Sequence, residues 1–214
     1  MGPLFFDLDM TLIETRRDLS ASANEVRRQL GLSPLSVDLI ATYIGDGVGD
    51  LLERAIGDEV EFDAEDALRR FRAHYWDHCL DATHAYTGIP ELLARLSGRP
   101  LAVVSNKPER FCRHILDGLR LAAHFDTMVG GDSAPARKPD PAPLRLAAER
   151  LGLSAEDAVM IGDTWRDVRS GKAAGCRTIA VTYGLDSEEK LKAEAPDALC
   201  PDVASVARCL DEWP

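Results

Sequence analysis

The sequence predicts an α/β fold: a doubly wound parallel sheet, interrupted directly after its first strand by an all-helical insert. Two observations support this prediction. After residue 83, short apolar runs of strand length alternate with helical patterns, which is typical of parallel βαβ units. Between residues 14 and 83 the apolar residues recur only at helical spacing. We therefore expect an α/β core of residues 1–13 and 84–214, and a helical domain of residues 14–83.

The chain begins with a short apolar run, Pro3–Phe6, which predicts a buried strand that ends at Asp7. Three helical patterns follow within the insert. They lie at Leu19–Leu30, Val48–Ile56 and Leu68–Cys79. Gly31 and Gly57 stand just after the first two patterns, and glycine commonly ends helices because it tolerates a left-handed backbone.

The rest of the core predicts further strands separated by helices. The strands are expected at Leu101–Val104, Thr127–Val129, Val159–Ile161 and Thr178–Val181. Helices are expected at Pro90–Leu96, around Ile115–Leu119, at Pro143–Leu151 and at Asp167–Ala174. One short turn is expected after Ser154, and short elements near Ala198–Cys200 and Val203–Leu210 close the chain.

Composition excludes several classes of protein. With 25 Lys+Arg and 36 Asp+Glu the net charge is −11, which repels phosphate backbones, so no nucleic-acid partner is expected. No apolar run approaches the roughly 20 residues that cross a bilayer, and no targeting segment is expected. Five cysteines without a C-x-x-C pair indicate free thiols and a cytoplasmic location. Monomer and homodimer both remain open.

Polar side chains follow the predicted strands at the points where they end. Asp7 and Asp9 follow the first strand, residues 105–107 (Ser-Asn-Lys) follow the second, and Asp163 follows a later one. In open parallel sheets, ligands bind outside the carboxyl ends of the strands. Because side chains alternate along a strand, we expect Asp7 and Asp9 to emerge on the same side.

These residue types point to phosphoryl transfer. Three acids at one sheet edge form an all-oxygen site that suits Mg²⁺. Ser105, Asn106 and Lys138 add donors for phosphoryl oxygens. The Asp7 carboxylate can attack phosphorus and hold it as an acyl phosphate. Asp9 can protonate the leaving alkoxide and then accept a proton from the attacking water.

The same residues resemble the haloacid dehalogenase superfamily of phosphatases over nearly the whole chain. Its four motifs are matched by Asp7–Thr11, Ser105, Lys138 and Gly162–Asp163 with Asp167. The resemblance implies a Rossmann-like core, with Asp7 as nucleophile and Asp9 as general acid and base. It also implies that Mg²⁺ is held by Asp7, Asp163 and the Asp9 backbone carbonyl.

By the same resemblance, Ser105 and Lys138 hold the phosphoryl group, and Asp167 orients Lys138 or a metal-bound water. The helical insert corresponds to the small cap domain of many members, which closes over the site and excludes water. Further matches look like the bacterial phosphoglycolate phosphatase subfamily. These are Ile44–Gly47, Val104–Pro108, Gly130–Asp132, Lys138–Leu144 and Ala173–Cys176.

The subfamily resemblance implies a small phosphorylated metabolite, 2-phosphoglycolate, as substrate. Thr11, Asn106 and Lys107 are then expected among the groups that bind substrate or phosphate. Gly45 and Gly47 are expected in a cap loop that approaches the substrate, because glycine lets backbone N–H groups come close. A plain helix-to-helix turn explains this glycine pair equally well.

One residue departs from the family pattern. Met10 stands between Asp9 and Thr11, where the family usually has glycine. If the backbone there needs a positive φ, methionine is strained. The alternative is that the local geometry tolerates methionine, whose side chain then narrows the leaving-group side of the site.

The sequence argues against two other functions of this superfamily. A haloalkanoic acid dehalogenase needs neither an acid at position 9 nor a metal, so Asp9 argues against it. A phosphonate hydrolase would use a cap lysine as a Schiff base, and residues 14–83 contain no lysine. Pyrophosphate, sugar phosphates and nucleotides remain open as substrates, and so does a non-catalytic binding module.

Overall fold

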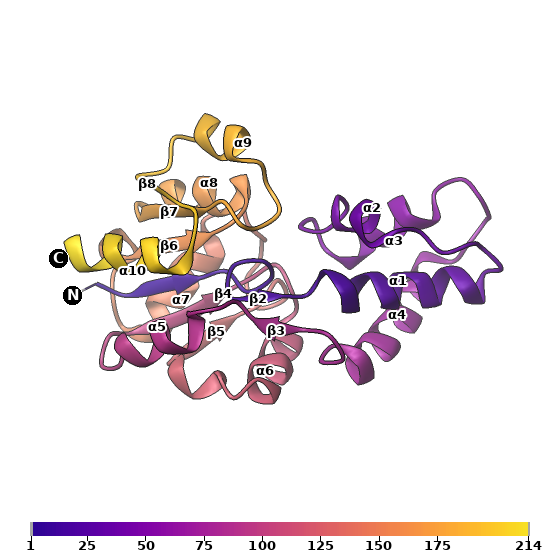
Figure 1. Cartoon of the computed structure of the whole chain (residues 1–214), viewed down its shortest axis with the longest axis horizontal. Helices are drawn as coiled ribbons and strands as arrows, with labels where there is room; N and C mark the ends of the chain where they lie inside the picture. Colours follow the sequence, from indigo (N-terminus) through magenta and orange to yellow (C-terminus); the bar gives the residue numbers. More distant parts are fainter. Residues whose placement is uncertain (1, 214) are drawn as a thin grey trace. The chain divides into compact units, whose positions relative to one another are not determined.

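The computed structural model describes residues 2–213 and divides the chain into two compact units. The α/β unit contains the chain up to Ile13 and from Ala85 onward, and the helical unit is Glu14–His84. The chain leaves and re-enters the α/β unit through two short paired strands, β2 (Ile13–Glu14) and β3 (His84–Ala85) (Figure 1). These unit boundaries differ from the predicted domain boundaries by one residue, His84.

Within residues 2–213, six parallel strands form the sheet of the α/β unit, in the order β5-β4-β1-β6-β7-β8 (Figure 1). They are β1 (Leu4–Phe6), β4 (Leu101–Val104), β5 (Thr127–Val129), β6 (Val159–Gly162), β7 (Arg177–Val181) and β8 (Ala198–Cys200). Leu4 of the central strand β1 pairs with Leu101 on one side and with Val159 on the other. The predicted doubly wound, parallel α/β fold is confirmed.

The central strands are buried because helices cover both faces of the sheet. On one face, Phe5 and Met160 join an apolar cluster with Leu144. Phe6 points to the opposite face, where its ring meets that of Phe125 edge-on at 6.3 Å. Burial on both faces explains why the strands read as continuous apolar runs in the sequence.

The helices of the α/β unit follow the predicted alternation with the strands. They are α5 (Ile89–Arg95), α6 (Glu109–Gly118), α7 (Ala142–Leu151), α8 (Trp165–Ala174), α9 (Glu188–Ala193) and α10 (Val203–Glu212), with 3₁₀ turns η1 (Ala122–His124) and η2 (Ala155–Asp157). Helices α7 and α8 pack against each other and against β4–β7, while α5 packs against α10. Gly152 and Gly175 end α7 and α8 in the left-handed conformation. Neither α9 nor η1 was predicted.

The helical unit contains α1 (Arg16–Gln29), α2 (Val37–Ala41), α3 (Val48–Ile56) and α4 (Ala64–His78). Helix α1 packs against the other three. The buried Arg27 links α1 to α3 and to the loops that follow these two helices, because its guanidinium donates to the carbonyls of Ser33 (2.7 Å) and Ala55 and to the Glu59 carboxylate (2.8 Å). Three of the helices match predicted patterns, and the five-residue α2 is additional.

Neither a disulfide nor a membrane span contributes to the fold of residues 2–213. All five cysteines are free. The Sγ atoms of Cys200 and Cys209 come within 3.6 Å, well beyond the roughly 2.05 Å of a disulfide bond. No helix within this described range has the length and apolar character needed to cross a membrane.

Candidate active site

The carboxyl ends of neighbouring strands bring three predicted site residues to one edge of the sheet. Asp7 directly follows β1, and its N–H donates to the carbonyl of Ile161 in β6 at 2.8 Å. Ser105 directly follows β4, and its N–H donates to the carbonyl of Val129 in β5 at 2.9 Å. Asp163 directly follows β6. These backbone bonds extend the sheet and thereby fix the positions at which the polar side chains begin.

Lys138 lies at the centre of this edge, in the loop between β5 and α7. Its buried Nζ donates to Asp167 Oδ1 at 2.6 Å and lies 2.9 Å from Asp7 Oδ1. The other oxygen of Asp167 accepts bonds from the backbone N–H (2.9 Å) and hydroxyl (2.6 Å) of Thr164, at the start of α8. Asp167 is thus held by its own helix, and it holds the ammonium group of Lys138 in turn.

Asn106 positions the main chain of Lys138. Its Nδ2 donates to the Lys138 carbonyl (3.0 Å), and its Oδ1 accepts from the Lys138 N–H (2.9 Å). Gly131 allows this loop to approach, since a Cβ there would lie 2.1 Å from the Asn106 carbonyl oxygen. Asn106 was predicted among the phosphate-binding groups. In the structure its side-chain amide instead bonds both the N–H and the carbonyl of Lys138.

Asp163 is wholly buried, and both of its oxygens are bonded. Oδ1 accepts from the Thr11 hydroxyl and Oδ2 from the Leu185 N–H, each at 2.8 Å. Gly184 allows the loop after β7 to pass close, because a Cβ there would lie 2.2 Å from Asp163 Cβ. Thr11, predicted to bind phosphate, therefore binds this carboxylate in the structure.

Asp9 lies apart from the strand that precedes it. Strand β1 ends at Phe6, and the following residues turn tightly, with the N–H groups of Leu12 and Ile13 both bonded to the Leu8 carbonyl. The alternation along a strand, which we used to place Asp7 and Asp9 on one side, therefore stops before Asp7. Asp9 Oδ1 accepts from Lys107 Nζ at 2.8 Å.

Ser105 and Lys107 both lie just after strand β4. The side chain of Lys107 is only 6% exposed, and its ammonium is paired with Asp9. The Lys107 N–H donates to Ser105 Oγ at 3.3 Å, and Ser105 is buried. Binding of substrate by Lys107 stays a prediction, and it requires a second interaction of an ammonium group that already holds Asp9.

The buried acids carry more negative charge than their surroundings neutralise. Burial raises the pKa of Asp7 to about 6; Lys138 opposes this shift, and the charge of Asp167 adds to it. Burial, followed by the charges of Asp7 and Asp167, raises the pKa of Asp163 well above its ordinary value. Burial lowers the pKa of the Lys138 ammonium, but Asp167 and Asp7 outweigh it and raise that pKa overall. A further positive charge would favour the ionised forms of both Asp7 and Asp163.

The residues at this edge fit a hard divalent cation. Carboxylate oxygens of Asp7, Asp163 and Asp167 all lie within 4.8 Å of one another. Within the described chain Asp7 Oδ1 is buried without a directed hydrogen bond, although Lys138 Nζ is near. Four carboxylates (with Asp9) face two ammonium groups, which leaves two negative charges, the complement of one divalent ion.

The carboxylate oxygens of this cluster differ in the hydrogen bonds that they accept. Asp167 accepts three hydrogen bonds from Lys138 and Thr164, whereas Asp7 Oδ1 accepts no well-directed one and meets the Lys138 ammonium at 2.9 Å. This difference favours Asp7 over Asp167 as a direct ligand and leaves Asp167 as the group that orients Lys138. Asp163, whose two oxygens each accept one neutral donor, is added to the ligands by the family resemblance. The Asp9 backbone carbonyl, which the family resemblance adds to the ligands, follows Asp7 in the same loop.

Gly45 and Gly47 belong to the helical unit, in the segment between α2 and α3. Both have a positive φ, 124° and 107°, which only glycine adopts readily. Asp46 between them forms an ion pair with Arg54 at 3.2 Å. The backbone conformation thus accounts for the two glycines, and an approach of this loop to the substrate stays a prediction.

Sequence reasoning missed the loop after β7. Tyr183 donates its hydroxyl to the Thr11 carbonyl at 2.8 Å, and Gly184 and Leu185 both lie against Asp163. The signal was available, because Tyr183 stands two residues after the predicted strand Thr178–Val181, as Asp163 stands two residues after the predicted strand Val159–Ile161.

Residues 4–181 match the sequence profile of the haloacid dehalogenase-like hydrolases. The chain belongs to the haloacid dehalogenase-like hydrolase family. The predicted membership, and with it the prediction that the protein is a hydrolase, is confirmed.

Several proteins that are similar to this chain share the name phosphoglycolate phosphatase. The phosphoglycolate phosphatase of Neisseria meningitidis serogroup A is 39% identical over 204 residues, which cover 92% of this chain and 86% of that protein. The phosphoglycolate phosphatase of Aquifex aeolicus is 36% identical and covers 99% and 97% of the two chains. A crystal structure of a predicted phosphoglycolate phosphatase from Haemophilus somnus superposes with a TM-score of 0.92, at 30% identity over 98% of each chain.

Proposed function

We propose that this haloacid dehalogenase-like hydrolase is a Mg²⁺-dependent phosphomonoesterase that acts through a phospho-aspartyl intermediate on Asp7, with 2-phosphoglycolate as its substrate. The observation that carries the proposal is the buried Lys138 ammonium between Asp7 and Asp167, beside Asp163 at the same strand ends. The substrate is supported by the names of the relatives in Neisseria meningitidis and Aquifex aeolicus.

In the first half-reaction, an Asp7 carboxylate oxygen forms a bond to phosphorus while the bond to the leaving oxygen breaks. Asp9 gives a proton to that oxygen, so that the product leaves as an alcohol. Lys138 and Ser105 donate to the phosphoryl oxygens, where negative charge accumulates in the transition state. Asp167 keeps the Lys138 ammonium aimed at Asp7 throughout.

In the second half-reaction, water attacks phosphorus and the bond to Asp7 breaks. Asp9, now a carboxylate, takes the proton from the attacking water. Inorganic phosphate is released, the Asp7 carboxylate is regenerated, and Asp9 is again protonated. Each half-reaction therefore uses the same two acids in complementary protonation states.

Asp7, Asp163 and the Asp9 backbone carbonyl would hold the Mg²⁺ ion. When bound, the ion supplies the positive charge that lets a phosphate dianion enter a site crowded with carboxylates. Thr11 and Leu185 keep Asp163 oriented through the bonds to its two oxygens. Burial of Asp163 excludes water from its coordinating side.

The helical unit is assigned the role of a cap that selects the leaving group, with Gly45 and Gly47 in the loop that contacts it. Alanine at either position is strained at positive φ, so the Gly45→Ala and Gly47→Ala variants should raise KM more than they lower kcat. We assign the cytoplasm as the location, because its reducing conditions keep thiols such as these five cysteines unpaired.

A panel of phosphate esters tests the proposal. Phosphate release would be measured from 2-phosphoglycolate, pyrophosphate, a sugar phosphate and a nucleotide, with Mg²⁺ and with a chelator. We expect hydrolysis only with Mg²⁺ and the highest kcat/KM for 2-phosphoglycolate. Preference for another ester would overturn the substrate, and no hydrolysis of any ester would overturn the reaction and favour a binding module.

A further inference from the structure

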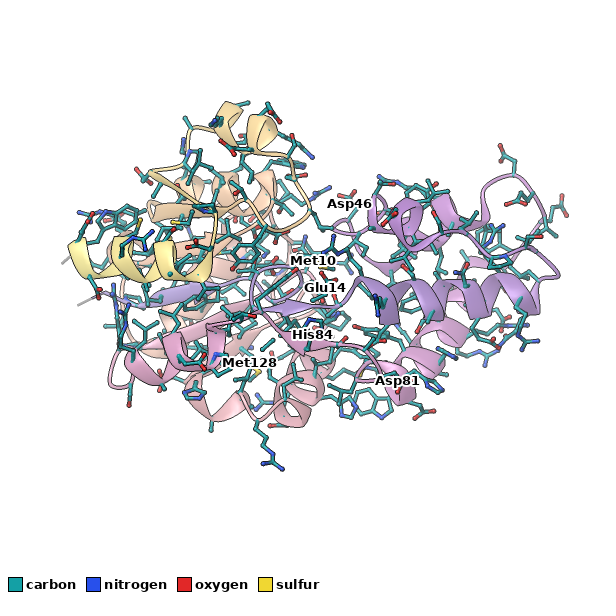
Figure 2. All side chains as sticks on the ribbon, viewed as in Figure 1. Met10, Glu14, Asp46, Asp81, His84 and Met128 are labelled. Carbon is teal, nitrogen blue, oxygen red and sulfur yellow. The ribbon has the colours of Figure 1, made fainter. Side chains whose placement is uncertain are left out.

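Met10 adopts a backbone conformation that methionine disfavours. Its φ is +61°, and Arg120 and Ala195 are the other non-glycine residues of the described chain with a positive φ. Both of those are exposed, whereas Met10 is fully buried. A left-handed backbone is unfavourable for a residue with a Cβ, so contacts around Met10 must stabilise it. Met10 lies in the turn between β1 and β2 and is labelled in Figure 2.

The φ of Met10 sets the direction of the Asp9 carbonyl. The Asp9–Met10 peptide is planar, so its carbonyl points opposite to the Met10 N–H. That N–H donates to the Ile13 carbonyl at 2.7 Å, which closes the tight turn after Asp9. If Met10 relaxed to a negative φ, this peptide would rotate and the Asp9 carbonyl would turn with it.

Two tyrosines of the α/β unit contact the strained turn. The Tyr183 hydroxyl donates to the carbonyl of Thr11, the residue after Met10, at 2.8 Å. The Tyr86 hydroxyl lies 3.9 Å from the Met10 sulfur, and the Tyr86 and Tyr183 rings pack with centroids 4.8 Å apart. Burial raises the pKa of the Tyr183 hydroxyl, which therefore remains a donor at all physiological pH values.

We propose that Tyr183, supported by Tyr86, is a positioning residue that holds Met10 in the left-handed conformation and thereby keeps the Asp9 carbonyl directed at the divalent cation. This inference rests on the proposed function. The Thr11 carbonyl can meet the Tyr183 hydroxyl only while the turn keeps its shape. The bond between Thr11 and Asp163 extends the same support to the second metal-binding acid.

A positioning role predicts a specific dependence on residue 10. Glycine adopts positive φ without strain, so a chain with Met10→Gly no longer needs Tyr183 to hold the turn. Alanine also removes the methionine side chain, but it keeps the Cβ and therefore the strain. Comparison of Met10→Ala with Met10→Gly separates backbone strain from the loss of buried volume.

The test measures the affinity for Mg²⁺ by titration calorimetry, and kcat separately, in chains with and without Tyr183→Phe. Tyr183→Phe removes one hydrogen bond. In the wild-type and Met10→Ala backgrounds we expect it to weaken the affinity for Mg²⁺ about five- to ten-fold. With Met10→Gly, the same Tyr183→Phe change should weaken affinity less than about two-fold. Tyr75→Phe, in a buried tyrosine of the helical unit, is the matched control and should leave affinity unchanged.

An equal effect of Tyr183→Phe in all three backgrounds would overturn the inference, because a plain packing role does not depend on the strain at residue 10. If the Met10 variants do not fold, the three remaining chains decide it: equal Mg²⁺ affinity of wild type, Tyr183→Phe and Tyr75→Phe overturns it, and a loss confined to Tyr183→Phe supports it. A wild-type chain that takes up no Mg²⁺ overturns the proposed function itself. The two failures are therefore distinguishable.

Discussion

Buried acids are satisfied differently in the two units of the molecule. In the helical unit, Asp18 is buried and accepts bonds from the N–H groups of Ala82 and Thr83 and from the Thr83 hydroxyl, at 2.7 to 3.1 Å. In the α/β unit, Asp7 has a buried oxygen with no directed hydrogen bond, and other acids crowd it. An acid saturated by neutral donors stabilises a fold, whereas an unsaturated acid among like charges indicates chemistry.

The positively charged partners differ in the same way. Lys138 is 3% exposed and joins two buried acids, whereas the arginines of the helical unit pair with carboxylates that solvent reaches. Even the buried Arg27 pairs with Glu59, whose side chain is 54% exposed. Exposed pairs contribute little to stability, and buried ones are costly to desolvate. A buried ammonium group shared by two buried acids at the strand ends therefore points to function.

The largest expected effect is that of Asp7→Asn. The amide cannot attack phosphorus, so kcat should fall on the order of 10⁴-fold or more, while the thermal midpoint is kept because a crowded charge is removed. Phosphate release and thermal unfolding would be measured together. The matched control is Asp58→Asn at an exposed position of the helical unit, which should leave both unchanged. Deamidation of the Asp7→Asn chain would regenerate aspartate at position 7, so the protein must be shown to be free of it. Retained turnover in such protein contradicts the comparison.

The next effect in size is that of Lys138→Met. Loss of the ammonium removes a phosphoryl donor and should lower kcat about 10²- to 10³-fold. It also leaves Asp7 and Asp167 uncompensated, so the metal-free protein should lose about 3–5 kcal/mol of unfolding free energy. Urea unfolding in chelator measures the loss, and Lys192→Met, which removes an exposed partner of Glu188, should show none. Unchanged stability would mean that Lys138 does not neutralise the buried acids.

Stability should depend on pH and Mg²⁺ with a definite sign. The pKa of Asp7 in the folded chain is about 6, above the ordinary 3.8, so the folded state binds more protons than the unfolded state between these values. The metal-free protein should therefore become less stable from about pH 4 to about pH 6, and the raised pKa of Asp163 extends this loss upward.

Mg²⁺ relieves the same repulsion, so its stabilising effect should grow over this pH range. Thermal midpoints with Mg²⁺ and with chelator, at about pH 5 and about pH 8, measure the difference. The Asp7→Asn chain serves as the control and should show a smaller increase. A stabilisation by Mg²⁺ that is larger at the lower pH would contradict the assignment of Asp7 and Asp163 as ligands.

The smallest effect on turnover is expected for Asp18→Asn, the same chemical change in the other unit. An amide nitrogen facing two N–H donors loses hydrogen bonds, so stability should fall by about 1–3 kcal/mol. The kcat at a temperature where the chain is folded should change less than about three-fold. Asp38→Asn, in the exposed part of α2, is the control. A loss of kcat without a loss of stability would break the contrast between the two buried acids.

The strands and the strand-end residues were predictable for one physical reason. Strands buried on both faces read as apolar runs, and polar residues directly after them must lie at the carboxyl edge. Asp7, Ser105 and Asp163 were found in this way. Helix α2 escaped because five residues are too few to show a helical period.

The partners of the site residues were not predictable from local pattern. Thr11 binds Asp163 across 152 positions of sequence, and Asn106 binds the Lys138 backbone across 32. Such contacts depend on how the sheet orders its strands, which spacing along the chain does not reveal. The positive φ of Met10 was one of two alternatives, and only the structure decided between them.

The central claim is that Asp7 becomes esterified to phosphorus. The most direct measurement is a single turnover with radiolabelled 2-phosphoglycolate and Mg²⁺, quenched in acid, followed by digestion and location of the label. The account predicts a label on the peptide containing Asp7 that hydroxylamine releases, and no label on the Asp7→Asn chain. The contradicting result is a wild-type chain that hydrolyses the substrate but carries no label at any quench time. That result would mean that water attacks phosphorus directly.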